Sequence, residues 1–322
     1  MAPIVATQPS WFYVMVVVTV LLLTELKHTF TEFAQRMKND EMITLAKFLA
    51  ISGIILPMLP HKNLLPDVNL TPYSIWLATV VVSGISYLSY LLKRYVFHES
   101  GTLVSGIIGG LYSSTATISV LARKSRKASE QEATDYVAAM LLAISMMFLR
   151  FMILILIFSR EIFLSIYPYL LTMAVVAAIV AWFIHSRQKR SNDQPVEAEE
   201  DDSSNPLEFK VALIFAVLFV VFTFLTHYTL VYAGTGGLNL LSFVSGFSDI
   251  TPFILNLLQN TGSVAALIIT ACSMQAIISN IMVNMFYALF FAGKGSKLRP
   301  WILGGFGVVI ACNLVLLLFF YI

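Results

Sequence analysis

The chain has 322 residues, of which 58% are hydrophobic and only 12% are charged, and its mean hydropathy is +0.82. Soluble domains usually carry about 25% charged residues, so this composition excludes an ordinary soluble protein. We expect an all-α polytopic membrane protein with the lipid bilayer as its main partner. At a net charge of +2 we expect no nucleic-acid partner.

Ten apolar segments follow one another along the chain. Eight are predicted to span the bilayer, and they are 11–26, 42–59, 73–92, 136–158, 163–184, 209–231, 263–291 and 301–321. The first lacks a small-residue cleavage site, so we expect a retained helix and not a signal peptide. The other two, 101–122 and 238–258, are interrupted by Gly, Ser and Pro and are predicted to be broken helices.

The distribution of Lys and Arg favours one topology. If all ten segments cross the membrane, the loops on the two sides carry 9 and 8 basic residues, which is no bias. If 101–122 and 238–258 enter and leave on the same side, the split becomes 15 against 2. Because cytoplasmic loops carry the excess of basic residues, we expect eight spans, two re-entrant segments, and both termini outside.

The two broken segments also resemble each other. A shift of 136 residues places Gly110 on Gly246, Ser113 on Asp249 and Thr115 on Thr251. We therefore predict two N-terminal helices (1–68), a first repeat (69–184), an acidic cytoplasmic linker (185–204) and a second repeat (205–322) inverted relative to the first. Inverted repeats with paired broken helices are typical of secondary transporters and of some channels.

The sequence resembles a known family over nearly its whole length. The stretches that carry the likeness are LAKFLAISGIILPMLP (45–60), GIIGGLYSSTATISVLARKSRK (106–127), SDITPFILNLL (248–258) and IISNIMVNMFYALFFAGK (277–294). They are similar to the C-terminal membrane domain of bacterial MgtC/SapB-type proteins, a domain of unknown function, here without the leading MgtC-like domain. The resemblance implies a bacterial inner-membrane protein but no particular substrate. Asn284 stands where the family often has Lys, which puts a cationic role there in doubt.

The first broken segment holds the densest group of candidate site residues. Its glycines allow close backbone approach, and a hydroxyl residue can cap a half-helix whose free N–H groups then face the membrane centre. This pattern predicts a substrate cradle, or alternatively a small-residue packing seam between helices. The candidates are Gly109, Gly110, Ser113, Ser114, Thr115 and Thr117.

Two charged residues inside the apolar segments are candidate site residues. Asp249, followed by Thr251 and Pro252, is a good helix cap, and at membrane depth it could also carry a proton or bind a cation. Arg150 could extend to the outer surface, bind an anionic group of a substrate, or pair with Asp249. Asn280 and Asn284 lie one turn apart and predict either a substrate-binding stripe or hydrogen bonds between helices.

We expect a secondary transporter with a central site between the broken helices. Its substrate is a small molecule or an ion, and we expect that substrate to carry an anionic group. The alternatives are a channel of the same architecture and a lipid-handling or signalling protein. Signatures of metalloproteases, serine hydrolases and P-loop enzymes are absent, so we expect no enzyme activity and no cofactor. Small residues at 106–110 and 304–307 are compatible with the interface of a homodimer.

Overall fold

We describe the protein from a computed structural model. The residues it describes are 17, 18, 20, 21, 24, 27, 39–65, 68, 70–97, 101–126, 130–187, 209–259, 264–293 and 296–321. The chain divides into two units, Met1–Ala50 and Ile51–Ile322, and each is considered by itself. The predicted span 11–26 and the linker after residue 187 lie largely outside the described residues.

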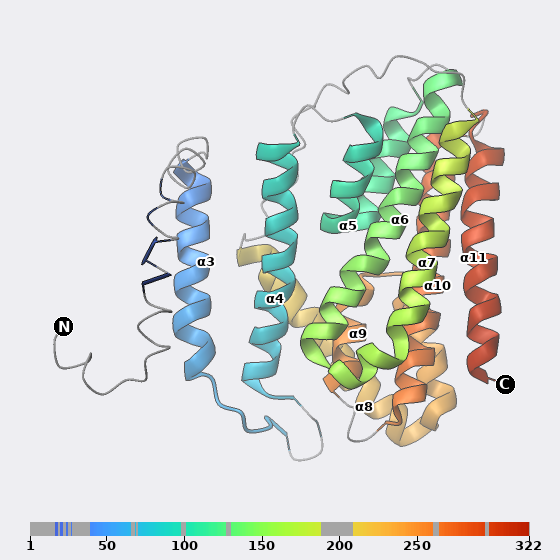
Figure 1. Cartoon of the computed structure of the whole chain (residues 1–322). Coiled ribbons are helices and arrows are strands. Elements are labelled where there is room, and N and C mark those ends of the chain that lie inside the picture. Colours follow the sequence, from blue (N-terminus) through green and yellow to red (C-terminus); the bar gives the residue numbers. More distant parts are fainter. Residues whose placement is uncertain are drawn as a thin grey trace. The chain divides into compact units, whose positions relative to one another are not determined.

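The described chain is helical, as predicted, and it carries eight helices long and apolar enough to cross a membrane. The protein is therefore an all-α polytopic membrane protein (Figure 1). The elements are α3 (Asn39–Met58), α4 (Pro72–Leu91) continued by the π-helical turn η1 (Leu92–Val96), α5 (Thr102–Lys124), α6 (Glu130–Phe158), α7 (Arg160–Ser186), α8 (Phe209–Ser245), α9 (Ile250–Gln259), α10 (Ala266–Ala292) and α11 (Arg299–Tyr321).

Helix α5 folds back on itself at Ser113, which has extended backbone angles (φ −158°, ψ 108°) inside an otherwise helical run. A Cβ atom built on Gly109 would lie 2.5 Å from the hydroxyl of Thr117, so residues before and after Ser113 pack against each other. Residues eight apart in a straight helix would be about 12 Å apart. Helix α5 is thus a hairpin of two arms, 102–112 and 114–124, and we call Ser113 the α5 break.

The first arm of α5 packs closely on α6. Cβ atoms built on Gly106 and Gly110 would lie 2.3 Å from the carbonyl oxygen of Ala139 and 2.5 Å from the Cα atom of Ala143. The contacts advance in the same direction along both helices, so the first arm runs parallel to α6. The small residues at 106–110 therefore allow close packing within the chain.

The second broken region repeats this arrangement. Helix α8 is longer than the predicted span 209–231 and contains a break at Gly234 (φ 58°, ψ −150°), a conformation that favours glycine. We call residues 235–245 the α8 arm, and residues 246–249, which lead into α9, the α9 turn. A Cβ atom on Gly246 would lie 2.3 Å from Cβ of Ser279 in α10. The glycine contact of the first region thus recurs 136 residues later, from Gly110 and Ala143 to Gly246 and Ser279.

The α8 arm also runs parallel to α10. Cys272 donates to Oδ1 of Asn239 (3.4 Å), and Ser279 donates to the carbonyl of Phe243 (2.7 Å). Within the second unit, Figure 1 shows α5 in the upper half and α9 in the lower half. The two broken regions therefore approach the middle of the bundle from different ends.

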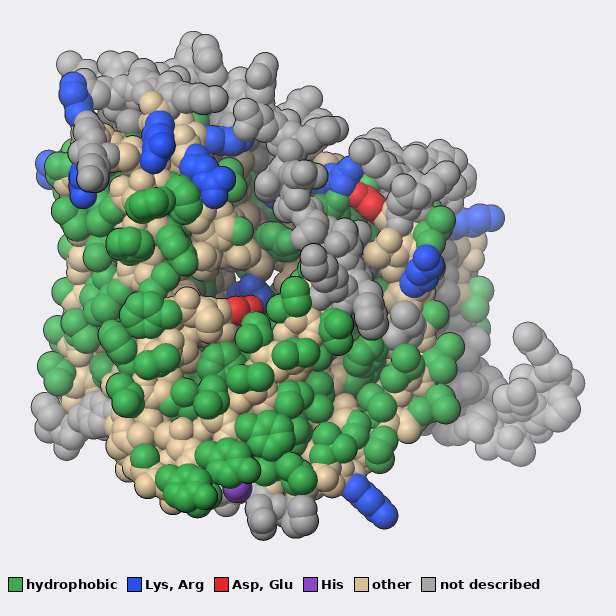
Figure 2. Space-filling view, turned by 180° about the vertical axis from the view of Figure 1, so that it is seen from behind, with side chains coloured by type: hydrophobic (Ala, Val, Ile, Leu, Met, Phe, Trp, Pro, Cys, Tyr) green, Lys and Arg blue, Asp and Glu red, His purple; other side chains and the backbone are tan. Residues whose placement is uncertain are grey.

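Basic side chains gather at one end of the second unit. They come from the ends of α4, α5, α7 and α10 and from the start of α11, and they are Lys93, Arg94, Arg123, Lys124, Arg126, Arg187, Lys297 and Arg299. Figure 2 shows Lys and Arg concentrated above a broad band of apolar side chains. Arg126 donates to the carbonyl of Phe290 (3.1 Å), and Arg123 lies 4.5 Å from the ring centre of Phe291, so this end also joins α5 to α10.

Candidate functional site

A cavity of about 440 Å³ lies between α4, α5, α6, α8, α9 and α10 of the second unit. The α5 break and the α9 turn both line it. Figure 2 shows a hollow at mid-height with one basic and one acidic side chain at its floor. Among the described lining residues, Arg150 is the basic side chain and Asp249 the acidic one. The cavity therefore places two opposite charges inside the apolar band.

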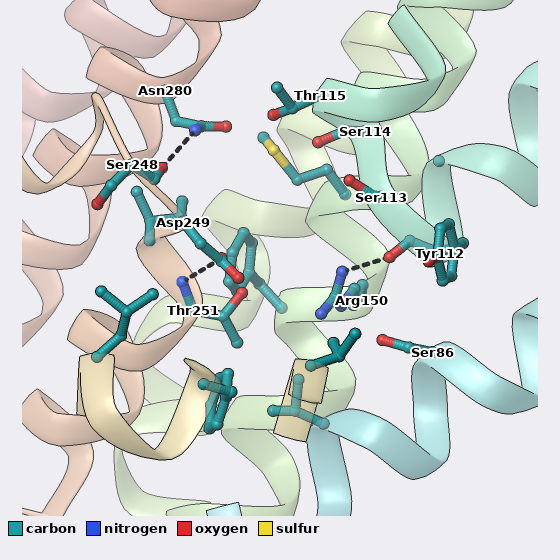
Figure 3. Close-up of a pocket in the computed structure, with 18 of the residues that line it drawn as sticks. Ser86, Tyr112, Ser113, Ser114, Thr115, Arg150, Ser248, Asp249, Thr251 and Asn280 are labelled. Atoms are coloured by element: carbon teal, nitrogen blue, oxygen red, sulfur yellow. Dashed lines mark hydrogen bonds between the residues drawn. The ribbon is translucent and has the colours of Figure 1, made fainter. Parts of the chain in front are cut away.

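The α5 break presents the start of a helix to this cavity. The hydroxyl of Ser113 accepts a hydrogen bond from the amide of Ala116 (3.3 Å), so Ser113, of the three hydroxyl residues that the sequence offered (Ser113, Ser114 and Thr115), caps the second arm. The first amides of a helix have no partner within the helix itself. Ser114 and Thr115, which hold these positions, line the cavity beside the cap (Figure 3).

The α9 turn faces the α5 break from the other side of the cavity (Figure 3). Oδ1 of Asp249 accepts a hydrogen bond from the amide of Thr251 (2.9 Å), which confirms the predicted cap. Asn280 of α10 supports the turn by donating to the carbonyls of Gly246 (3.2 Å) and Ser248 (3.5 Å). The carboxylate of Asp249 is exposed within the cavity.

Arg150 reaches the cavity from α6 and lies beside the α5 break. Its Nη1 donates to the carbonyl of Tyr112 (2.8 Å), the last residue of the first α5 arm. Its Nε is buried and has no hydrogen-bond partner within the described residues. The side chain lines the cavity and does not extend toward the outer surface.

Eight of the eleven residues predicted as site residues line this cavity. They are Gly110, Ser113, Ser114, Thr115, Arg150, Asp249, Thr251 and Asn280. Gly109 and Thr117 pack against each other inside the α5 hairpin, and Asn284 donates to Oδ1 of Asn280 (3.0 Å). These three residues lie outside the lining, where they hold the α5 hairpin together and orient Asn280.

The sequence did not point to several polar lining residues. Ser83 and Ser86 lie three residues apart on α4, so they share one face of that helix, and both are buried. Tyr112, Ser248 and Tyr287 also line the cavity. The serine spacing on α4 is the one signal that could have been read, because polar residues on a single face of a spanning helix face the protein interior.

The lining suits a small ligand with both polar and apolar parts. Its volume falls within the range of about 300–1,000 Å³ typical of small-molecule sites. Among the described residues, no group of three or more His, Cys, Asp or Glu side chains could hold a metal ion. The groups available to a ligand are therefore the guanidinium, the carboxylate, hydroxyls, helix-start amides and apolar side chains.

The fold and the cavity define a polytopic α-helical membrane protein with two broken helical regions around a central cavity. The chain belongs to the family described as Domain of unknown function (DUF4010), which matches residues 80–292. It is also 25% identical over 224 residues to an uncharacterized protein of Aquifex aeolicus (strain VF5), across 69% of this chain and 96% of that protein. No solved structure matches the chain. The matched region contains every residue that lines the cavity.

Proposed function

We propose that the protein is a secondary transporter whose substrate binds in the central cavity. The observation that carries this proposal is the meeting of two broken helical regions at one cavity that holds a buried guanidinium. Backbone outside regular helix is tolerated at membrane depth only where protein buries it or where it lines a wet cavity. A charged side chain at that depth is costly and is a functional hypothesis by default.

We further propose that the two broken regions belong to inverted repeats, 69–184 and 205–322. Two correspondences at a shift of 136 residues support this. Gly110 meets Ala143 as Gly246 meets Ser279, and Ser113 caps its helix as Asp249 caps α9. In such proteins transport proceeds as one repeat rocks against the other around a fixed site.

The substrate carries an anionic group in this proposal. Arg150 and the helix start at Ser114 lie together at one wall of the cavity, and both favour negative charge. The MgtC/SapB-like resemblance and the basic end formed by α4, α5, α7 and α10 support a bacterial inner-membrane protein with that end in the cytoplasm. Both termini then lie outside, and the protein is a carrier without enzymatic activity.

Thiol accessibility from the two sides of the membrane tests this function without knowledge of the substrate. Cysteines replace Ser86 or Thr115 in the cavity, in a background in which Cys272 and Cys312 are replaced. Lys124→Cys and Thr235→Cys serve as controls at the two ends of the second unit. Right-side-out and inside-out vesicles are then treated with a membrane-impermeant thiol reagent.

For a transporter, we expect the two end controls to react from opposite sides and the cavity cysteines to react from one side at a time. Changing the ion gradient should shift their reactivity to the other side. Simultaneous reaction from both sides, with single-channel currents in bilayers, would indicate a channel. Cavity cysteines that react from neither side, while both end controls react, would indicate that the broken helices serve only for packing.

A further inference from the structure

The two charges in the cavity do not satisfy each other. Neither Arg150 nor Asp249 has an ion-pair partner among the described residues, although both line the same cavity and each charge acts on the other. Each charge is held by a backbone hydrogen bond, with Tyr112 or Thr251, but an opposite charge in a low-dielectric region would stabilise it further. A ligand that carries one negative charge alone would leave Asp249 uncompensated, and a cation alone would leave Arg150 uncompensated.

The α5 break has the character of a carboxylate site. Nη1 of Arg150 donates a hydrogen bond to the carbonyl of Tyr112. The positive charge of Arg150 thereby also neutralises the negative end of the first α5 arm. The other edge of the guanidinium carries Nε and Nη2, and its Nε–H is buried without a partner within the described chain, so a ligand reaches this edge after the side chain turns further into the cavity. Two parallel N–H groups on one edge of a guanidinium match the two oxygens of a carboxylate. The helix-start amides at Ser114 and Thr115 add positive potential at the same wall.

The α9 turn has the opposite character. Asp249 uses one oxygen to cap the amide of Thr251, which neutralises the positive end of α9, and its carboxylate faces the cavity. The α8 arm ends at Ser245, so the negative end of its dipole also lies at this turn. Carboxylates and the carbonyl ends of half-helices are the groups that hold cations at breaks of this kind. The turn is suited to an ammonium group.

The rest of the lining is apolar on the α8 side. Val211, Ile214, Phe215 and Leu218 come from one face of α8 and contribute no polar side chain. This wall can accept a hydrocarbon group but offers no hydrogen bond. It therefore complements the two charged walls.

We propose that the substrate is a small zwitterion with an apolar side chain, of the α-amino acid type. Its carboxylate binds Arg150 at the α5 break, its ammonium group binds Asp249 at the α9 turn, and its side chain lies against α8. This inference rests on the proposed function, which it deepens by naming the substrate class. It also gives Asp249 a role that a helix cap alone does not require.

Three probes with the same isobutyl group test the inference directly. L-Leucine carries both charges, 4-methylpentanoate lacks the ammonium group, and isoamylamine lacks the carboxylate. Binding to the purified full-length chain in detergent is measured by isothermal titration and by ligand-induced thermal stabilisation, with L-valine and L-phenylalanine as further zwitterions. We expect leucine to bind at least about tenfold more tightly than either single-charge probe, because each of those leaves one charge unpaired.

Two variants assign the charges to the two walls. Asp249→Asn keeps an oxygen that can cap Thr251, so it should weaken leucine at least about tenfold and leave 4-methylpentanoate unchanged or tighter. Arg150→Gln should weaken leucine and leave isoamylamine unchanged. If Arg150→Gln does not fold, Arg150→Lys is used in its place, because it keeps the positive charge but cannot form two parallel hydrogen bonds to a carboxylate. Asp135→Asn and Arg187→Gln, outside the cavity, are the matched controls.

The possible outcomes separate this inference from the proposed function. Tighter binding of 4-methylpentanoate than of leucine would show that the substrate is a plain anion and not a zwitterion. Tighter binding of isoamylamine than of leucine would show that the substrate is a cation. Failure of all three amino acids to bind the folded protein would overturn the inference as well. In each of these cases the proposed transport function would still be judged by the thiol experiment, which uses no substrate.

Discussion

The α5 break and the α9 turn both start a helix inside the bundle, but they cap that helix with different chemical groups. Each region has a helical arm that runs parallel to the following long helix, α6 or α10, and each meets that helix through a glycine, Gly110 or Gly246. The α5 break is one residue, Ser113, capped by a neutral hydroxyl. The α9 turn has four residues and ends in a carboxylate cap, Asp249.

This difference shows how two similar backbones can acquire opposite polarity. At the α5 break, the cap adds no charge and Arg150 takes the carbonyl of Tyr112, so the wall is electropositive. At the α9 turn, the cap itself is the charge and occupies the helix-start amide. One residue at an equivalent position, Ser113 or Asp249, together with Arg150, therefore determines the sign of the charge that each wall presents to the cavity.

The largest expected effect comes from breaking the glycine contact that the two regions share. Gly110→Leu and Gly246→Leu should each lower the free energy of unfolding by about 3 kcal/mol or more, because even a Cβ atom would lie 2.5 Å or less from α6 or α10. Thermal unfolding and size-exclusion chromatography of the purified variants would measure this. Gly304→Leu is the control, since a Cβ atom there meets nothing within 4 Å. Equal melting temperatures for Gly110→Leu and Gly304→Leu would contradict the close contact.

A smaller effect should distinguish the two regions. Asn280→Leu removes the amide that donates to the carbonyls of Gly246 and Ser248, and it leaves Asn284 without its acceptor. We expect a loss of about 1–3 kcal/mol in stability, measured by thermal unfolding. Ala143, the α6 residue in contact with Gly110, has no polar side chain, so Ala143→Ser should cost less. If both substitutions are equally mild, the α9 turn does not depend on its polar support.

The smallest change in stability is expected from exchanging the two caps. Ser113→Ala and Asp249→Ala should each cost about 1 kcal/mol through loss of a helix cap. The double exchange Ser113→Asp with Asp249→Ser keeps both caps and should recover most of that loss. Melting curves of the single and double variants provide the comparison. A double variant as unstable as the two alanine variants together would show that the regions are not equivalent in their capping.

Sequence reasoning located both breaks because their chemistry is local. A run of Gly and Ser interrupts 101–122, so the sequence offered Ser113 as one of three possible caps, and Ser-Asp before Thr251 and Pro252 is a helix-start signal that identified Asp249 as a cap. The charge bias favoured segments that return to the side they entered, and the hairpin of α5 has that form. These features depend on a few neighbouring residues or on composition.

Other features depend on contacts between distant residues, and the sequence could not reveal them. The partner of Arg150 is a backbone carbonyl, that of Tyr112, which has no side-chain signature. Thr117 is a predicted site residue, but the fold turns it against Gly109. Gly234 breaks α8 three residues beyond the predicted end of the span, where a lone glycine gives only a weak signal.

The burial of α9 has a consequence for how the protein is made. At about 1.5 Å per residue, its ten residues cover about 15 Å, roughly half of the hydrocarbon core. Residues Ile250 to Leu258 are all buried, and Asn256 donates to Thr223 of α8, so none of these residues faces lipid. It cannot partition into the bilayer as an independent unit during synthesis. We therefore expect α9 to pack against α8 and α10 only after α10 has been synthesised. Assembly of the central cavity would then be a late step in biogenesis.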